Sequence, residues 1–234
     1  MNVIGHRGAS VAEPENTPNA FATADAMGAD GVELDVRITT DGEGAQRLVV
    51  FHDPLPAAQA EVDALPDLSD VLESCGQRML VNVELKNSAD DGGHDPTMAV
   101  VAPTVELLRS QPSGSSDRWL FSSFDLATIE TCRLVAPEIP TGYLVLAADD
   151  DAIAAARAGG HAAIHPWAEG LTEDRVRACH EAGLVVNTWT CNDVDRLVEL
   201  ERIGVDGVCT DVPDRALEAL GRGSAVRPAW GTRA

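Results

Sequence analysis

Short β-type runs alternate with helix-type stretches along nearly the whole chain. The first pair is Val3–Ile4, followed by apolar positions at helical spacing from Ala20 to Met27, where Gly28 ends the periodicity. The later β-type runs are Gly31–Val36, Met79–Leu85, Trp119–Ser123, Gly142–Leu146, Ala162–His165, Leu184–Thr188 and Val205–Thr210. The helix-type stretches behind the last six of these are Met98–Leu108, Leu126–Val135, Ala152–Ala158, Thr172–Ala182, Asn192–Ile203 and Val212–Leu220. Eight such strands in series predict an α/β fold, a closed (β/α)8 TIM barrel. An open doubly wound sheet is the alternative, but the sequence lacks the glycine-rich dinucleotide fingerprint of that fold.

One further run, Arg47–His52, is also strand-like, but it follows the second predicted strand too closely for a parallel crossover. The gap contains Asp41-Gly42, a pair typical of hairpin turns, and shows no helical periodicity. We therefore predict an extra β-hairpin arm after the second strand. Residues 33–40 would rise out of the barrel mouth, and the returning antiparallel run would bring His52 beside Asp35.

Two predicted strands alternate between apolar and polar residues. Strands buried on both faces are expected to be continuously apolar. Glu33 and Asp35 share one face of the first of these strands, and Asn82, Glu84 and Lys86 share one face of the second. If the apolar faces meet the helical layer, these polar side chains point into the barrel near the strand ends. Buried carboxylates without partners are costly, so a cation is expected beside them.

A divalent metal ion bound by Glu33, Asp35 and Glu84 is the simplest such cation, because Lys86 alone cannot neutralise three carboxylates. All three ligands are oxygens, which favours magnesium or calcium, with manganese also suitable. Zinc is disfavoured because no His-x-His or His-Glu-x-x-His motif accompanies them. An ordinary ion-pair network, or an antiparallel sheet with one wet face, remains the alternative.

Cationic and titratable side chains surround the same predicted mouth. Lys86 is the only lysine in a chain whose Lys and Arg total 17, and its compact ammonium suits a phosphoryl oxygen. Arg7 adds a bidentate phosphate donor. His6 ends the first strand and His52 ends the hairpin arm, so the two can serve as base and acid in a displacement at a phosphodiester. The role of His165 stays open.

Composition and charge exclude several other functions. The 234 residues are 44% hydrophobic and 24% charged, which is typical of a globular protein with a substantial core. A net charge of −21 argues against binding to nucleic acid through a basic patch. No apolar run approaches the roughly 18 residues of a membrane span, and the start lacks a signal-peptide pattern, so we expect a cytoplasmic protein. The five cysteines are scattered and lack CxxC spacing, so we expect reduced core residues.

A set of short motifs occurs in a specific order along the chain. It comprises His6-Arg7-Gly8, Pro14-Glu15-Asn16-Thr17, Gly31-Val32-Glu33-Leu34-Asp35-Val36, Phe51-His52-Asp53, Glu84-Leu85-Lys86, Ser122-Ser123-Phe124, His165-Pro166, Thr188-Trp189-Thr190 and Thr210-Asp211. This ordered set resembles the glycerophosphodiester phosphodiesterase family over roughly residues 2–220. The chain is accordingly expected to hold one catalytic domain, residues 1–220, and a C-terminal tail, residues 221–234.

The resemblance implies a TIM barrel with a divalent cation on Glu33, Asp35 and Glu84. It also implies acid-base roles for His6 and His52, phosphate contacts from Arg7 and Lys86, and a pocket in which Trp189 and Phe124 pack on glycerol carbons. The reaction implied is hydrolysis of a small glycerophosphodiester to an alcohol and sn-glycerol 3-phosphate, with attack by water or by the substrate's own hydroxyl left open. Association of copies of the chain into a homo-oligomer is also left open.

The chain departs from the family pattern after the second histidine. Members of the family usually carry a small inserted subdomain there, but here the segment from His52 runs almost directly to Leu65–Leu72. We therefore expect a more open mouth, or one that a neighbouring subunit closes. Two alternative functions remain: a phosphodiesterase resembling phospholipase D or sphingomyelinase D, and a catalytically silent binding barrel.

Overall fold

The computed structural model describes residues 1–89, 93–111, 116–222 and Trp230. The strands are β1 (Asn2–His6), β2 (Gly31–Thr40), β3 (Gln46–Val50), β4 (Leu80–Leu85), β5 (Trp119–Ser123), β6 (Thr141–Val145), β7 (Ala163–Pro166), β8 (Val185–Thr188) and β9 (Gly207–Thr210). The helices are α1 (Pro18–Met27), α2 (Gln59–Asp63), α3 (Leu68–Ser74), α4 (Val101–Ser110), α5 (Leu126–Val135), α6 (Asp150–Ala158), α7 (Glu173–Glu181), α8 (Val194–Arg202) and α9 (Pro213–Ala219), with a 3-10 turn at Ser116–Arg118. None of the helices in the described ranges is long and apolar enough to cross a membrane.

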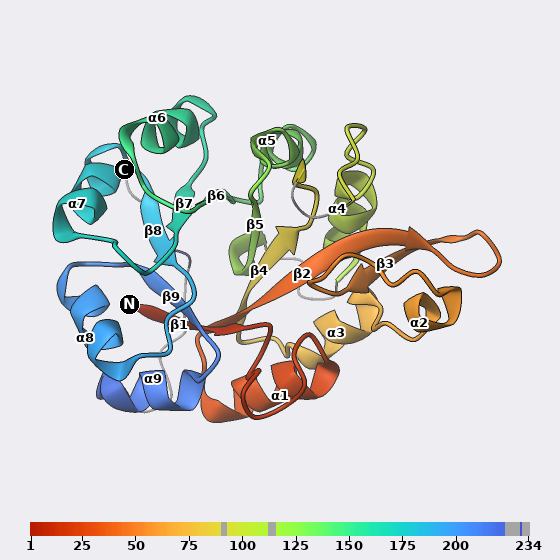
Figure 1. Cartoon of the computed structure of the whole chain (residues 1–234), viewed down its shortest axis with the longest axis horizontal. Coiled ribbons are helices and arrows are strands. Elements are labelled where there is room, and N and C mark those ends of the chain that lie inside the picture. The colour runs from red at the N-terminus through yellow and green to blue at the C-terminus, as the bar shows by residue number, and fades with distance from the viewer. Residues whose placement is uncertain (90–92, 112–115, 223–229, 231–234) are drawn as a thin grey trace.

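Eight parallel strands close into a barrel, which confirms the predicted fold. The order around the sheet is β1-β9-β8-β7-β6-β5-β4-β2, and β1 also pairs with β2 to complete the ring. Helices surround this ring on its outer side (Figure 1). The registers place the carboxyl ends of neighbouring strands at one mouth, since His6 pairs with Glu33 and Asp35 pairs with Glu84.

The apolar and polar residues of β2 face the sides that the sequence predicts. Val32, Leu34 and Val36 are fully buried in the cluster between the sheet and the helical layer. The intervening Glu33 and Asp35 must then face the barrel interior, because successive side chains of a strand point to opposite faces. A polar interior at the mouth therefore follows directly from the apolar packing on the outside of the same strand.

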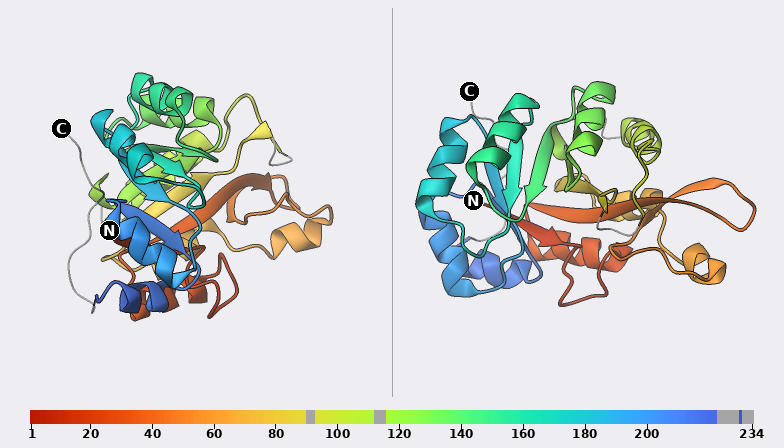
Figure 2. Two further views of the ribbon diagram at one scale, coloured as in Figure 1. Left: turned by 60° about the vertical axis from the view of Figure 1, so that its left-hand side comes forward. Right: turned by 45° about the horizontal axis from the view of Figure 1, so that its top comes forward.

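The predicted hairpin arm is confirmed. β3 pairs antiparallel with the outer half of β2, with Val36 opposite Val50, and the arm projects away from the barrel (Figure 2). β3 starts earlier than expected and ends at Val50, so His52 lies in the following loop. The backbone N–H of Phe51 nevertheless donates to the Asp35 carbonyl at 3.0 Å, which brings the loop back beside the second strand as predicted.

The segment after β3 contains two short helices that the sequence analysis did not predict. α2 stands where the inserted subdomain was expected to be nearly absent, and α3 begins within the Leu65–Leu72 segment that follows it. Arg47 of β3 ties this segment to the arm, because its guanidinium donates to Asp67 and to the carbonyl of Leu65. The segment is therefore a compact connection held against the arm.

Beyond α9, Arg222 and Trp230 form hydrogen bonds with earlier parts of the chain. Arg222 donates to the Asp30 carboxylate and to the Met1 carbonyl. The Trp230 indole N–H donates to the Arg118 carbonyl at 3.1 Å. The rest of the expected C-terminal tail, residues 223–229 and 231–234, lies outside the described residues.

Candidate active site

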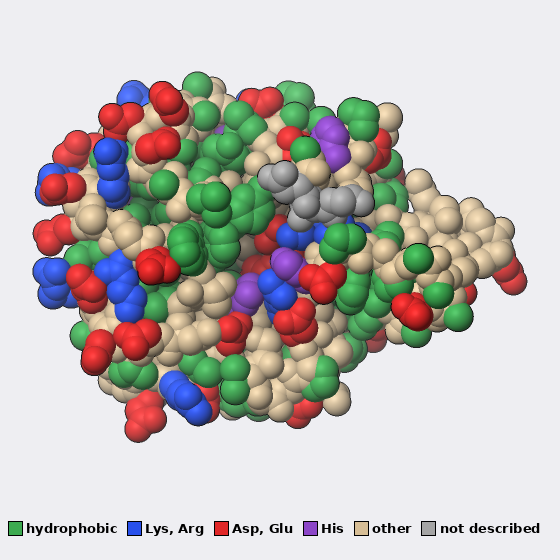
Figure 3. Space-filling model, in the orientation of Figure 1, with side chains coloured by type: hydrophobic (Ala, Val, Ile, Leu, Met, Phe, Trp, Pro, Cys, Tyr) green, Lys and Arg blue, Asp and Glu red, His purple; other side chains and the backbone are tan. Residues whose placement is uncertain are grey.

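A cavity of about 110 Å³ opens among the predicted site residues at the carboxyl ends of the strands. Its lining includes His6, Arg7, Glu33, His52, Glu84, Lys86, Phe124 and Trp189. In Figure 3, acidic, basic and histidine side chains gather around a hollow near the centre of this face. The predicted residues are thus brought together from several separate strands, and Asp35 is buried immediately behind them.

Three carboxylates form the centre of this site. One oxygen from each of Glu33, Asp35 and Glu84 lies within 4.8 Å of the others. Burial raises the pKa of Glu33 well above its usual value, and the nearby charges of Asp35 and Glu84 raise it further. Its Oε1 atom is buried without a hydrogen-bond partner among the described residues. The site therefore disfavours three negative charges unless a cation joins them.

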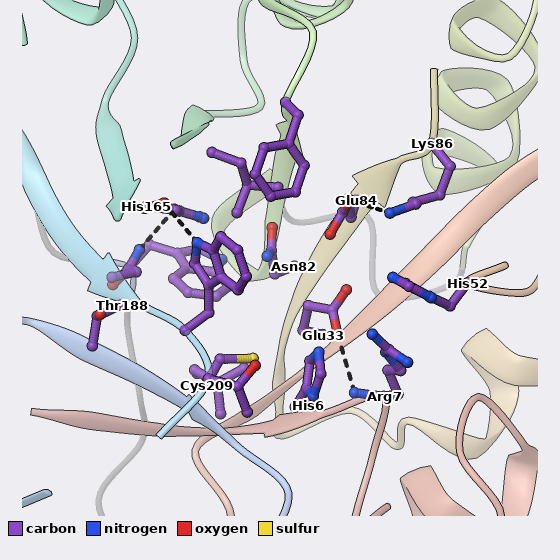
Figure 4. A pocket seen from close by; sticks show the side chains of 17 residues that line it. His6, Arg7, Glu33, His52, Asn82, Glu84, Lys86, His165, Thr188 and Cys209 are labelled. Carbon is purple, nitrogen blue, oxygen red and sulfur yellow. Dashed lines mark hydrogen bonds and ion pairs between the residues drawn. The ribbon is translucent and has the colours of Figure 1, made fainter. Parts of the chain in front are cut away.

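Two side-chain cations partly offset this charge. The Lys86 ammonium lies 2.9 Å from Glu84 Oε1 and 3.8 Å from Asp35 Oδ1. Arg7 Nε lies 3.4 Å from Asp35 Oδ2, while its Nη1 donates to Glu15 at 2.9 Å. In Figure 4, Lys86 and Arg7 approach the carboxylates from different sides. Both cations therefore border the space where an anionic substrate group would meet the acidic cluster.

A tight turn after β1 places Arg7. Arg7 and Gly8 both have positive φ angles, 54° and 86°. A Cβ atom at position 8 would lie 2.6 Å from the Ala20 backbone, so α1 packs too closely for any residue but glycine. The turn directs the Arg7 backbone N–H to Glu33 Oε2 at 3.1 Å. His6-Arg7-Gly8 is thus a unit that both presents a cation and holds one carboxylate.

Each of the two predicted histidines pairs with an aspartate through Nδ1. His6 Nδ1 lies 2.7 Å from Asp211 Oδ1, and His52 Nδ1 lies 2.9 Å from Asp53 Oδ1. A carboxylate only accepts hydrogen bonds, so each Nδ1 carries the proton. The other ring nitrogen, Nε2, is then the atom available for proton transfer in the cavity.

Asp211 was not predicted as a site residue, although it belongs to a motif on which the family resemblance rests. Ser10 and Asn192 also donate to its carboxylate. Burial alone would raise the pKa of Asp211, but the hydrogen bonds from His6 and Asn192 outweigh it and lower the pKa to about 2. Asp211 therefore stays ionised and orients the His6 ring.

This lowered pKa predicts a pH-dependent stability. The contribution of Asp211 is fully present above its ordinary pKa of 3.8 and is lost as the pH falls through about 2. We expect Asp211→Asn to lower the midpoint of thermal unfolding near neutral pH, and the difference from the parent protein to narrow below about pH 4. Thermal unfolding followed by circular dichroism across this range measures it. A difference that stays constant with pH would assign Asp211 a packing role alone.

An aromatic pair forms one wall of the cavity. Phe124 and Trp189 meet edge to face with ring centroids 5.3 Å apart. The Trp189 indole donates to the His165 carbonyl at 2.8 Å, which fixes its orientation. Both residues line the cavity, and the Lys86 ammonium lies 6.0 Å from the centroid of the Phe124 ring.

His165, whose role the sequence left open, lies deep in the same cavity. Burial lowers the pKa of His165 to about 3, so its ring is neutral near pH 7. Its Nε2 lies 3.1 Å from the Asn187 side-chain amide, and its ring packs so closely on Gly142 that a Cβ there would clash with it. The chain therefore places a neutral ring deep in the cavity.

The fold and the cavity together define a class of protein. The chain is a TIM barrel whose polar groups converge on a pocket at the carboxyl ends of its strands, the face on which barrel enzymes carry their active sites.

Comparisons with known proteins identify the family within this class. The family model of the glycerophosphoryl diester phosphodiesterase family matches residues 6–64 and 54–215. A glycerophosphodiester phosphodiesterase of Caldanaerobacter subterraneus subsp. tengcongensis is 29% identical, with 94% of this chain and 98% of that protein covered. One of Bacillus altitudinis is 30% identical, with 92% and 96% covered.

Comparison with solved structures indicates the same family. A phosphodiesterase of Oleispira antarctica in complex with the product sn-glycerol-3-phosphate has a TM-score of 0.81 at 26% identity, with 94% of this chain and 97% of that chain covered. The chain therefore belongs to the glycerophosphoryl diester phosphodiesterase family, and the predicted enzyme class, phosphoric diester hydrolase, is confirmed.

Proposed function

We propose that this enzyme hydrolyses glycerophosphodiesters to an alcohol and sn-glycerol 3-phosphate with the help of one divalent cation. The observation that carries the proposal is the convergence of three carboxylates and two aspartate-paired histidines on one small cavity. The Oleispira antarctica structure supports the choice of product, because its bound ligand is sn-glycerol-3-phosphate.

The acidic cluster fits a hard divalent cation. Its donors are all oxygens, they converge within 4.8 Å, and the buried Glu33 Oε1 has no partner among the described residues. Glu33, Asp35 and Glu84 would hold magnesium or calcium, with manganese also suitable. When bound, the cation supplies Lewis-acid stabilisation of charge developing on the phosphoryl oxygens.

The two histidines would perform the proton transfers. One accepts a proton from the attacking hydroxyl, whether of water or of the substrate's own glycerol, and the other donates a proton to the leaving alkoxide. His6 and His52 are suited to this pair of roles because each has its Nδ1 held by a carboxylate and both line the cavity. The aspartates also stabilise the imidazolium that forms during the reaction.

The remaining groups would bind the substrate. Lys86 and Arg7 border the acidic cluster and would contact the phosphate, while Phe124 and Trp189 would pack on the glycerol carbons. We further propose that residues 1–220 form the catalytic domain and residues 221–234 its tail, because α9, the last helix among the described residues, ends at Ala219.

Lys86 provides a test of the phosphate site. Its ammonium is almost completely buried between Glu84 and Asp35, where a larger planar guanidinium would displace one of them. We expect Lys86→Arg to lower kcat/KM by about 10-fold or more, although the charge is retained. Steady-state kinetics with an unchanged circular dichroism spectrum would establish this effect. Kinetics equal to those of the parent enzyme would show that only the charge is needed.

Phosphorus NMR with the purified enzyme tests the reaction itself. The substrates are glycerophosphocholine, glycerophosphoethanolamine, glycerophosphoglycerol and glycerophosphoinositol, each with magnesium, with calcium and with EDTA. We expect conversion to sn-glycerol 3-phosphate that EDTA stops. Turnover that persists in EDTA would overturn the metal assignment. If no diester reacts under any condition, a lysophospholipid substrate or a silent barrel becomes the better interpretation.

A further inference from the structure

We propose that Arg37 is a positioning residue for His52; this inference rests on the proposed acid-base role of His52. Arg37 lies on β2, two residues beyond Asp35 and four beyond Glu33, and its side chain is buried, with 5% of the residue exposed. Its Nη2 atom donates to the backbone carbonyl of His52 at 2.6 Å. The strand that carries two of the acidic residues thus also holds the loop that carries a histidine.

The loop needs such an anchor because His52 has little support of its own. β3 ends at Val50, and His52 lies in a segment without regular secondary structure. Its imidazole is 36% exposed, and among the described residues its ring hydrogen-bonds only to Asp53, whose side chain is 73% exposed. The flanking Phe51 N–H bond to Asp35 holds one side of the loop, and the Arg37 bond holds the carbonyl of His52 itself.

His6 differs in each of these respects. It ends β1, so its backbone belongs to the barrel, and its aspartate partner is fixed by Ser10 and Asn192. The two histidines are therefore held by different means. A hydrogen bond from a buried guanidinium is charge-assisted and stronger than one between neutral groups. It can therefore fix a loop that lacks the backbone hydrogen bonds of a β-ladder.

Arg37 acts through His52 and does not itself face the substrate. It is absent from the lining of the catalytic cavity, which His52 shares with Lys86 and Glu33. Arg37 instead lines a neighbouring cavity of about 130 Å³ together with Asn87 and Asp95, and Lys86 stands between the two cavities and lines both. Loss of its guanidinium should therefore change the position of the His52 ring and leave the substrate contacts intact, which lowers kcat without raising KM.

A double-mutant cycle tests this inference. Misplacement of a catalytic group by about 1 Å costs about 10²-fold in rate, so we expect Arg37→Met to lower kcat by about that factor and to leave KM within about threefold. In a His52→Ala background the same substitution should change kcat by less than about threefold, because residues that act as a unit are not additive. Arg37→Lys should recover part of the loss.

Arg47→Met is the matched control. Arg47 also lies on the arm and also donates to a backbone carbonyl, that of Leu65, but it does not contact His52. We expect this variant to keep kcat within about twofold of the parent value. Thermal unfolding of all variants, with and without magnesium, monitors the fold and the acidic cluster. If Arg37→Met does not fold, Arg37→Lys replaces it in the cycle.

Three outcomes would overturn the inference: an equal loss of kcat in both backgrounds, a rise confined to KM, or no loss at all. Failure of the underlying proposal is distinguishable from these. If His52→Ala alone leaves kcat unchanged, the acid-base role of His52 is wrong, whatever Arg37 does.

Discussion

Glu33→Gln is expected to abolish metal-dependent turnover, with a loss of kcat of about 10³-fold or more, while the fold stays intact. The loss follows because a cation that stabilises developing phosphoryl charge contributes several kcal/mol, and every 1.36 kcal/mol or so is a factor of ten in rate. Phosphorus NMR of glycerophosphodiester turnover with saturating magnesium measures it. Glu84→Gln is expected to behave alike, because its carboxylate belongs to the same cluster.

Stability measurements separate this effect from damage to the fold. Burial and the charges of Asp35 and Glu84 raise the pKa of Glu33, so its ionised form is disfavoured in the folded protein without metal. A neutral amide removes this cost, and the metal-free variant should unfold at the same temperature as the parent protein or higher. Magnesium should raise the unfolding temperature of the parent protein only, because a ligand stabilises the state that binds it.

An isosteric control uses a carboxylate far from the cavity. Glu138 pairs with Arg109 at an exposed position, and Glu138→Gln should leave turnover and the magnesium response unchanged. Near-normal activity of Glu33→Gln, or a magnesium response equal to that of the parent protein, would show that Glu33 is not a metal ligand.

The inward-facing polar groups could be predicted from the sequence because strand geometry is local. In Val32–Val36 the apolar residues must pack against helices, so Glu33 and Asp35 can only point inward. The hairpin was predictable for a similar reason, since the gap before the returning strand is too short for a crossover. Each inference needed a few neighbouring residues and one geometric rule. The packing of the apolar residues and the cavity lining confirm the first inference, and the antiparallel pairing of β3 with β2 confirms the second.

The supporting contacts were not predictable from local patterns. Asp211 meets His6 across 205 positions of sequence, and Trp230 meets Arg118 across 112. Strand alternation predicts only that the Arg37 side chain faces the same side as Glu33 and Asp35. Its hydrogen bond to the His52 carbonyl depends on how the loop folds back. Periodicity predicts which face a side chain takes, but the partner on that face depends on the closure of the whole barrel.

Helices α2 and α3 were missed for a different physical reason. Each is short, with five and seven residues, and neither has a side-chain hydrogen bond at its N-terminus. Isolated helices of this length are not stable in water. They form here because Arg47 and the buried apolar residues Val62 and Leu68 hold the segment against the barrel and its arm. Tertiary contacts, and not helix propensity, determine this part of the fold.

His52→Ala is the second large effect, with an expected loss of kcat of about 10²-fold or more and a modest change in KM. General acid-base catalysis by one side chain contributes about 10²- to 10⁴-fold, and its removal affects the transition state more than the bound substrate. Steady-state kinetics on a glycerophosphodiester would show this division between kcat and KM. His180→Ala is a suitable control, because His180 is part-buried against Asp206 and lies outside the cavity lining.

The leaving group offers a sharper version of the same test. A donor of a proton to the leaving alkoxide matters little when the leaving group is already stable as an anion, as in a p-nitrophenyl phosphodiester. If His52 is that donor, the loss of kcat caused by His52→Ala should be smaller with the activated substrate. If His52 is instead the base, its loss of kcat should stay the same, and the loss caused by His6→Ala should become smaller. A loss confined to KM in His52→Ala would make His52 a binding residue, and the cavity would then need a different proton-transfer group.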